Sequence, residues 1–136
     1  AQAKVLRALQ ENRITPVGSG KSIPVDVRII AATNKNLKKE IEAGRFREDL
    51  YHRLSVIVID VPSLNSRKQD IPELIDHFLN NLTDQGFSPK TFTQEAIDHL
   101  KSSDWTGNVR ELRNVVERLH ILGSNPVLLE EASKYS

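Results

Sequence analysis

The spacing of the hydrophobic residues along this chain changes near residue 61. Before that point, near-continuous apolar runs alternate with segments of helical periodicity. Beyond it, apolar residues recur only at the three- and four-residue spacing of amphipathic helices. The pattern therefore predicts an α/β part over residues 1–61 and an all-helical part over residues 62–136. Pro62 and the polar stretch Ser63–Arg67 predict a linker between them.

Two segments of the first part have the composition of buried strands. Residues 25–33 contain a near-continuous run of β-branched and small residues, 27–32, and residues 55–61 form another near-continuous apolar run. Such runs are typical of strands covered on both faces in parallel sheets. Between them, Leu37 and Ile41 lie one helical turn apart, and Gly44 can end that helix. A strand, intervening helices and a second strand predict a parallel crossover unit.

An amphipathic helix and a glycine-rich turn precede the first strand. Residues 2–11 carry an apolar face that we expect to pack on the sheet. The sequence Gly18-Ser-Gly-Lys-Ser22 is similar to the end of a phosphate-binding P-loop. However, Thr15 stands where that pattern requires glycine, and the P-loop needs a helix to begin at its lysine. Because Ile23-Pro24-Val25 and a strand follow instead, we interpret the segment as a plain turn.

Two arginines flank the apolar stripe of a further predicted helix. Phe46, Leu50 and Leu54 recur at four-residue spacing, which places them on one face. At about 100° per residue, Arg47 and Arg53 lie roughly 60° from the stripe, on opposite edges. Both guanidinium groups can then emerge at the margin of the core. They either clamp a phosphate or simply extend into solvent from an apolar stem.

Asn34 closes the first predicted strand with a polar side chain. In open α/β sheets, ligands bind beyond the carboxyl ends of the strands. Asn34 is therefore a candidate for recognising a bound ligand. The alternative interpretation is the cap of the following helix.

The second part predicts three helices. Asp70 with Glu73, and Asn108 with Glu111, have the spacing of capping boxes, and Thr93 can cap the middle helix. The apolar faces of these helices consist of Ile71, Leu74, Ile75, Phe78, Leu79 and Leu82, then Ala96, Ile97 and Leu100, then Val109, Leu112, Val115, Val116 and Leu119.

Arg110 lies in the first turn of the last predicted helix. A cation there faces the positive end of the helix dipole, which is mildly unfavourable. Either an anionic ligand such as a triphosphate compensates for it, or the arginine is exposed and pairs with Glu111 or another acidic neighbour.

Charge and composition limit the classes of partner. Nineteen basic and eighteen acidic residues give a net charge of +1, so no global field attracts DNA or an anionic membrane. The chain has no cysteine, which is compatible with the reducing cytoplasm where we place it. It also contains no membrane span, signal peptide or methionine, and it starts within a helical pattern. We interpret it as an excised fragment.

Three motifs in this order resemble one known family. RIIAATN (28–34), GRFREDLYHRL (44–54) and GNVRELRN (107–114) are similar to the AAA+ ATPase domain of bacterial enhancer-binding proteins, the sigma-54-dependent activators of the nitrogen-regulation type, which include two-component response regulators. The resemblance covers essentially the whole chain. It implies the C-terminal part of a P-loop-type parallel-sheet AAA+ core followed by an all-α helical lid.

The resemblance also implies roles for four residues. Asn34 matches sensor I, which senses the γ-phosphate, and Arg47 and Arg53 match arginine fingers that reach the neighbouring protomer's nucleotide. Arg110 matches sensor II of the lid. No residue is assigned to a metal, and ATP with Mg²⁺ is expected in the parent protein only.

The implied partners are neighbouring protomers in a ring homo-oligomer, and sigma-54 RNA polymerase and enhancer DNA through other parts of the parent. No membrane partner is expected. A complete Walker A motif, an acidic Walker B pair and a GAFTGA loop are absent from these residues, so we expect the fragment alone to be inactive. Thr106, where the family usually has proline, and Asn65 and Ser66, in place of an arginine-rich linker, fall outside the implied roles.

Two non-enzymatic alternatives remain open at this level. Three helices ending in a basic one are typical of a helix-turn-helix DNA reader, although Glu111 and Glu117 interrupt its arginines and the loop before Thr93 is long for that motif. A helical oligomerisation module is the other alternative, and it would tolerate loss of Arg47, Arg53 and Arg110.

Overall fold

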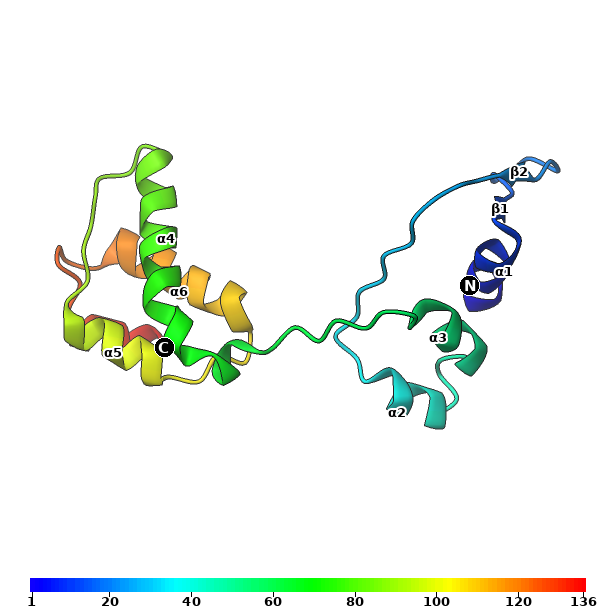
Figure 1. The fold of residues 1–136 in the computed structure, drawn as a ribbon. Helices are drawn as coiled ribbons and strands as arrows, with labels where there is room; N and C mark the ends of the chain where they lie inside the picture. Colours follow the sequence, from blue (N-terminus) through cyan, green and yellow to red (C-terminus); the bar gives the residue numbers. More distant parts are fainter. The chain divides into compact units, whose positions relative to one another are not determined.

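A computed structural model describes all 136 residues and divides them into two compact units (Figure 1). Unit 1 comprises Ala1–Asp60 and unit 2 comprises Val61–Ser136.

Unit 1 contains three helices and a small hairpin. Its elements are α1 (Gln2–Glu11), β1 (Arg13–Ile14), β2 (Ile23–Pro24), α2 (Leu37–Glu42) and α3 (Glu48–Leu54). The two short strands pair antiparallel, with Ile14 opposite Ile23. The helix predicted over residues 2–11 is confirmed. The glycine-rich segment is confirmed as a turn, since Gly18 adopts a φ of 79° within the hairpin loop.

Helices α1 and α3 pack side by side and form the core of unit 1. Leu6 on α1 and Leu50 on α3 are its two buried apolar side chains. The side chain of Gln2 accepts the Arg47 amide (2.9 Å) and donates to the Arg45 carbonyl (2.8 Å), which joins the beginnings of the two helices. Burying two leucines stabilises the unit by roughly 3–6 kcal/mol, so this core is small.

The two buried strands predicted for unit 1 are not formed. Residues 25–33 and 55–61 are irregular, and their isoleucines lie in solvent, with Ile30 86% and Ile57 75% exposed. The parallel-sheet core of the predicted fold class is therefore not confirmed within these residues. The physical reason is that a strand needs neighbouring strands to pair its amides and carbonyls. Apart from the Val25 amide, which donates to the Asn12 carbonyl at 2.8 Å beside the hairpin, these two runs pair neither with each other nor with the hairpin.

The arginine-flanked helix begins later than the periodicity predicts. Arg47 occupies the N-cap position in an extended conformation, with a ψ of 133°, and Phe46 precedes it. Only Arg53 is helical, so the prediction that both arginines edge one helical stripe is wrong for Arg47. Glu48 and Asp49 occupy the first turn, where acidic side chains complement the dipole.

Unit 2 is helical, as the sequence predicts, and forms the larger core. Its elements are two 3₁₀ turns, η1 (Leu64–Ser66) and η2 (Lys68–Asp70), followed by α4 (Ile71–Asp84), α5 (Gln94–Ser102), α6 (Asn108–Leu122) and α7 (Leu129–Tyr135). Helices α4 and α6 pack together, as do α5 and α7. The core consists of Leu64, Ile71, Ile75, Phe78, Ala96, Leu100, Trp105, Leu112, Val115, Val116, Leu119, Val127 and Ala132.

The predicted linker is part of this core. Leu64 is fully buried, and the polar residues around it fold into 3₁₀ turns. The cause is tertiary, because the Leu64 amide donates to the side chain of Asn108 at 2.8 Å. Sequence composition alone does not reveal that bond.

The three predicted caps have different outcomes. Thr93 accepts the Ala96 amide at 3.3 Å and caps α5, as predicted. Asp70 stands at the N-cap of α4 but accepts no amide there, and it contacts Arg67 instead. At α6 the cap is one residue early, since Glu111 accepts the Gly107 amide at 2.8 Å and Gly107 occupies the N-cap.

Helix α7 is an element that the apolar pattern does not predict. It carries only Ala132 as a buried residue, and its start is fixed by polar contacts. Glu131 accepts the amides of Leu128 (2.9 Å) and Ser124 (2.8 Å). The Ser124 hydroxyl donates a third hydrogen bond to Glu131 at 2.8 Å. Two backbone bonds just before the helix, from the Thr93 amide to Val127 and from the Val127 amide to Thr91, join the start of α7 to the start of α5.

Candidate functional site

Asn34 lies in the loop before α2 rather than at the end of a strand. Its side chain is exposed and makes no hydrogen bond. The cap of α2 is Asn36, whose Oδ1 accepts the Lys39 amide at 3.2 Å. Asn34 is therefore not the helix cap that formed the alternative interpretation, and its amide group is free to contact a ligand.

Arg47 is held in a bidentate ion pair. Its Nε donates to Oδ1 of Asp49 at 2.9 Å, and its Nη2 donates to Oδ2 at 2.7 Å. The Arg47 guanidinium holds the pKa of the Asp49 carboxyl below its usual value, and the carboxylate raises the pKa of Arg47. Both side chains are about half exposed, so a stronger anion can compete for Arg47.

Arg53 lies in the last turn of α3, six residues after Arg47. It is exposed, and its Nη2 donates to the carbonyl of Leu9 near the end of α1, at 2.9 Å. The remaining guanidinium donors are free of protein partners. Along the helix axis, six residues correspond to about 9 Å, so the two arginines mark opposite ends of α3. Both ends are fixed to α1, one through Gln2 and the other through Leu9.

Arg110 occupies the first turn of α6 in unit 2. It is exposed and forms no ion pair or hydrogen bond, so the alternative in which it pairs with Glu111 is wrong. Glu111 is engaged with the Gly107 amide instead. By contrast, Arg113 on the same helix pairs with Glu117 at 2.7 Å. Arg110 therefore presents an uncompensated positive charge beside the positive end of the helix dipole, an arrangement suited to an anion.

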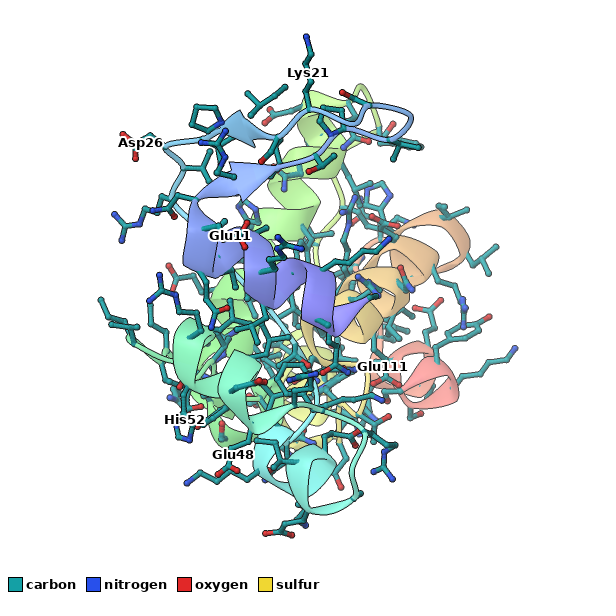
Figure 2. All side chains as sticks on the ribbon, turned by 90° about the vertical axis from the view of Figure 1, so that its right-hand side faces the viewer. Glu11, Lys21, Asp26, Glu48, His52 and Glu111 are labelled. Atoms are coloured by element: carbon teal, nitrogen blue, oxygen red, sulfur yellow. The ribbon has the colours of Figure 1, made fainter.

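Lys21 does not belong to a phosphate cradle. It lies in the hairpin loop, exposed, and points away from the ribbon (Figure 2). No helix begins at Lys21 or Ser22, and β2 follows at Ile23. The backbone geometry that a P-loop requires is therefore not present at this segment.

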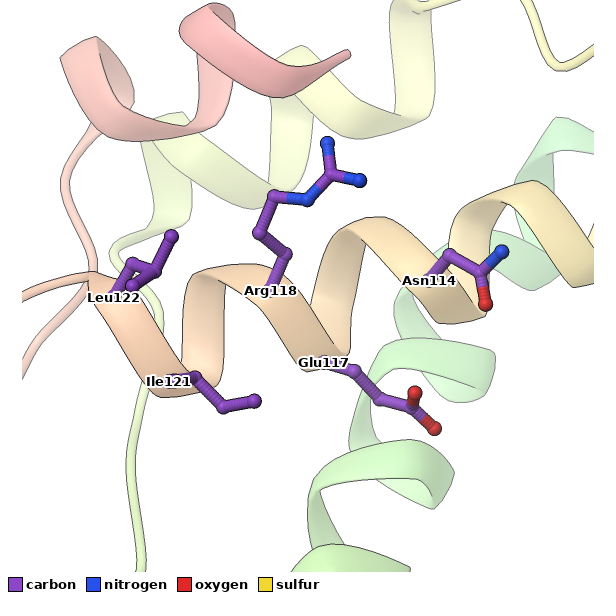
Figure 3. A pocket seen from close by; sticks show the side chains of 5 residues that line it. All are labelled: Asn114, Glu117, Arg118, Ile121 and Leu122. Carbon is purple, nitrogen blue, oxygen red and sulfur yellow. The ribbon is translucent and has the colours of Figure 1, made fainter.

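A hollow on the surface of α6 contains none of the four candidates. It has a volume of about 400 Å³ and is lined by Asn114, Glu117, Arg118, Ile121 and Leu122. Arg118 and Leu122 point from one side of the helix, and Glu117 and Ile121 from another (Figure 3). The hollow is open, and no side chains converge in it. No group of three or more histidine or acidic residues suits a metal ion, and no helix is long and apolar enough to span a membrane.

Three residues with polar contacts near the candidates are not found by sequence reasoning. Asp49 pairs with Arg47, Asn108 accepts the Leu64 amide, and Asn65 accepts the Trp105 amide at 2.8 Å. The sequence singled out Asn108 only as a cap of its own helix, and Asn65 only as a departure from the family's arginine-rich linker. Asn65 thus has a contact role where the sequence suggested none.

Two family models match this chain. The Sigma-54 interaction domain matches residues 1–60, and the AAA+ ATPase lid domain matches residues 65–132.

Among curated relatives, the transcriptional regulatory protein ZraR of Salmonella typhimurium is 50% identical over 122 residues, which cover 89% of this chain and 28% of ZraR. The DNA-binding transcriptional regulator NtrC of Rhizobium meliloti is 47% identical over 131 residues, covering 96% of this chain and 27% of NtrC. The chain thus spans less than a third of the length of either relative.

Among solved structures, NtrX from Brucella abortus in complex with ATP has a TM-score of 0.89 and 42% sequence identity, covering 96% of this chain and 32% of NtrX. The structure of the same protein in complex with ADP has a TM-score of 0.89 and 43% identity.

Proposed function

This chain belongs to the sigma-54-dependent transcriptional activators, within which it matches the C-terminal portion of the AAA+ ATPase module, and from that membership we propose that it supplies residues that act on ATP in a ring of protomers. Arg47 and Arg53 are proposed as arginine fingers directed at the neighbouring protomer's nucleotide. Asn34 is proposed as sensor I and Arg110 as sensor II.

The observation that carries this proposal is the placement of the two arginines at opposite ends of α3. Both ends of that helix are fixed to α1, and both guanidinium groups are exposed. A short helix held in this way offers two cationic groups on a rigid support, which suits contact with a phosphate chain from outside the subunit.

The proposed chemistry is hydrolysis of the bond between the β- and γ-phosphates. A water molecule attacks the γ-phosphorus in line with the leaving oxygen, and negative charge spreads over the transferring phosphoryl group. Arg47 and Arg53 stabilise that charge, and Arg110 contacts the phosphates from the lid. The amide of Asn34 is proposed to sense the γ-phosphate.

The nucleotide is proposed as ATP with Mg²⁺, by analogy with the NtrX structures in complex with ATP and ADP. The residues here supply cationic contacts but no phosphate cradle and no metal cluster, so other parts of the complete module would hold the β-phosphate and Mg²⁺. We therefore expect this chain alone to bind ATP weakly and to show no turnover.

The proposed biological role is remodelling of sigma-54 RNA polymerase in the cytoplasm by an activator of the response-regulator type. Contacts with the polymerase and with enhancer DNA would come from other parts of the protein. The contacts made by these 136 residues would be with neighbouring protomers of a homo-oligomeric ring.

Mixing two inactive variants of the complete protein tests the proposal. Arg47→Ala keeps its phosphate cradle but lacks a finger, whereas a variant of the Walker A lysine lacks the cradle but keeps both fingers. Removal of a trans arginine finger costs roughly 10³- to 10⁵-fold in rate in other nucleotide hydrolases. Recovery of ATPase activity on mixing is expected, because some interfaces then hold both parts. Normal hydrolysis by both Arg47→Ala and Arg53→Ala would refute the finger assignment.

A further inference from the structure

The turn between α5 and α6 is hydrogen-bonded to residues 64–68, where the chain enters unit 2. These residues are called the entry segment. Asn108 Oδ1 accepts the Leu64 amide at 2.8 Å, and Asn65 Oδ1 accepts the Trp105 amide at 2.8 Å. Lys68 adds two bonds from its Nζ, to the Ser102 carbonyl and to Asp104 Oδ1, each at 2.9 Å. The entry segment and the start of α6 are therefore joined by hydrogen bonds in both directions.

This junction is also packed. Leu64 is fully buried and Trp105 is 2% exposed, with its indole N–H donating to the Leu100 carbonyl at 2.9 Å. Because Leu64 is excluded from water, no solvent molecule can replace Asn108 as the acceptor for its amide. Loss of the Asn108 acceptor would leave a buried donor without a partner, which is the costly way to lose a hydrogen bond.

Asn108 holds a backbone conformation that few residues adopt. Its φ is 56°, in the left-handed region where asparagine, aspartate and glycine are favoured. It is the first residue of α6, directly after Gly107, where an added Cβ would lie 2.8 Å from the Cβ of Glu111. The start of α6 is therefore defined by one tight turn, and Asn108 is the residue of that turn that reaches the entry segment.

Arg110 follows two residues later, exposed and without a partner. Resting on the sensor II role proposed above, we propose that Asn108 is a positioning residue for Arg110. By bonding the Leu64 amide, Asn108 fixes the first turn of α6 to the point where the chain enters the lid. Any movement of the entry segment then carries the Arg110 guanidinium with it.

Two substitutions at Asn108 separate the hydrogen bond from the backbone conformation. Asn108→Gly tolerates the left-handed φ but has no acceptor for the Leu64 amide. Asn108→Asp tolerates it as well and keeps an oxygen acceptor. Both are made in the complete protein, with and without Arg110→Ala, and the affinity for ATP is measured at equilibrium.

A buried donor left without its acceptor corresponds to a change of up to about 5- to 150-fold in an equilibrium constant. We expect Asn108→Gly to weaken ATP binding by about that factor when Arg110 is present, and Asn108→Asp to bind nearly as the wild type does. In the Arg110→Ala background, Asn108→Gly should cause no further loss, because the residue acts through Arg110. Asn65→Ala removes the second bond of the junction and should behave like Asn108→Gly, which keeps the test decisive if the glycine variant folds poorly.

The outcomes distinguish this inference from the proposed function. If Arg110→Ala alone leaves ATP affinity unchanged, the sensor II role fails, and the positioning role fails with it. If Arg110→Ala weakens binding but Asn108→Gly does not, or does so equally in both backgrounds, sensor II stands and the positioning role is refuted.

Discussion

The guanidinium of Arg47 and the carboxylate of Asp49 form a two-point ion pair across the first turn of α3, with nitrogen–oxygen distances of 2.9 and 2.7 Å. The residue proposed to reach a neighbouring subunit is therefore bound within its own subunit. A phosphate group must compete with Asp49 for the same donors.

Replacement of Asp49 by asparagine should release Arg47. An exposed pair is worth about 0–1 kcal/mol, so we expect half-maximal ATPase activity of the complete protein at up to about fivefold lower protomer concentration. The measurement is ATPase rate against protomer concentration. Glu48→Gln is the matched control, because Glu48 lies in the same turn but contacts His52 only at 3.8 Å. A lower rate for Asp49→Asn would mean that the carboxylate orients Arg47 rather than restraining it.

Loss of Arg110 should weaken nucleotide binding without unfolding the lid. A hydrogen bond to a charged group contributes about 1.5–3 kcal/mol, so Arg110→Ala should lower ATP affinity by about 10- to 100-fold. Helical content, followed by circular dichroism, should stay unchanged because the side chain has no protein partner. Arg113→Ala, on the same helix but paired with Glu117, serves as the control. Unchanged affinity and hydrolysis in Arg110→Ala would show that Arg110 is an ordinary exposed residue with no role in nucleotide binding.

The docking of α7 should depend on pH through Glu131. Hydrogen bonds from the amide of Leu128, and then from Ser124, lower the pKa of its carboxyl below the usual 4.5. Because the folded-state pKa lies below the unfolded one, the stabilisation is complete above about 4.5 and is lost as the pH falls through the folded-state value.

Glu131→Gln should therefore lower the thermal midpoint of unit 2 at neutral pH, and its difference from the wild type should shrink in acid. Glu130→Gln is the control, since the Glu130 side chain accepts no hydrogen bond. A difference that stays constant down to acidic pH would show that the ionised carboxylate is not what holds α7.

Lys21→Ala should leave ATP hydrolysis by the complete protein within about twofold of the wild type, the usual range for an exposed substitution away from a site. The lysine lies in the hairpin loop, and β2 rather than a helix follows it in the sequence. Abolished turnover would mean that the Gly18–Ser22 turn binds phosphate after all.

The sequence predicts the helices better than the strands, and the reason is physical. Helical hydrogen bonds lie within the segment, so the apolar periodicity of residues 71–82 and 109–119 was enough to place α4 and α6. A strand's hydrogen bonds lie outside it. Residues 25–33 and 55–61 have the composition of strands but no partner among the described residues, and they remain irregular.

Polar side-chain contacts account for the remaining differences between the sequence predictions and the structure. Motif matching selected Asn34, Arg47, Arg53 and Arg110 as candidates, and their proposed roles stay predictions. It did not indicate that Arg47 is paired with Asp49. Nor does spacing reveal that Asn108 bonds Leu64, 44 positions earlier, instead of capping its own helix. The Asn108–Leu64 bond depends on the packed core of unit 2, in which Leu64 is fully buried.

The burial of Trp105 has a practical consequence for observing these events. It is the only tryptophan of the 136 residues, and it is 2% exposed. Its own amide donates to Asn65, and Asn108, three residues later, accepts the Leu64 amide. Tryptophan fluorescence of this chain therefore arises from a single indole inside unit 2, next to the start of α6. Loosening of that junction would admit water to the indole and shift the emission to longer wavelength, so an unlabelled sample reports directly on the lid.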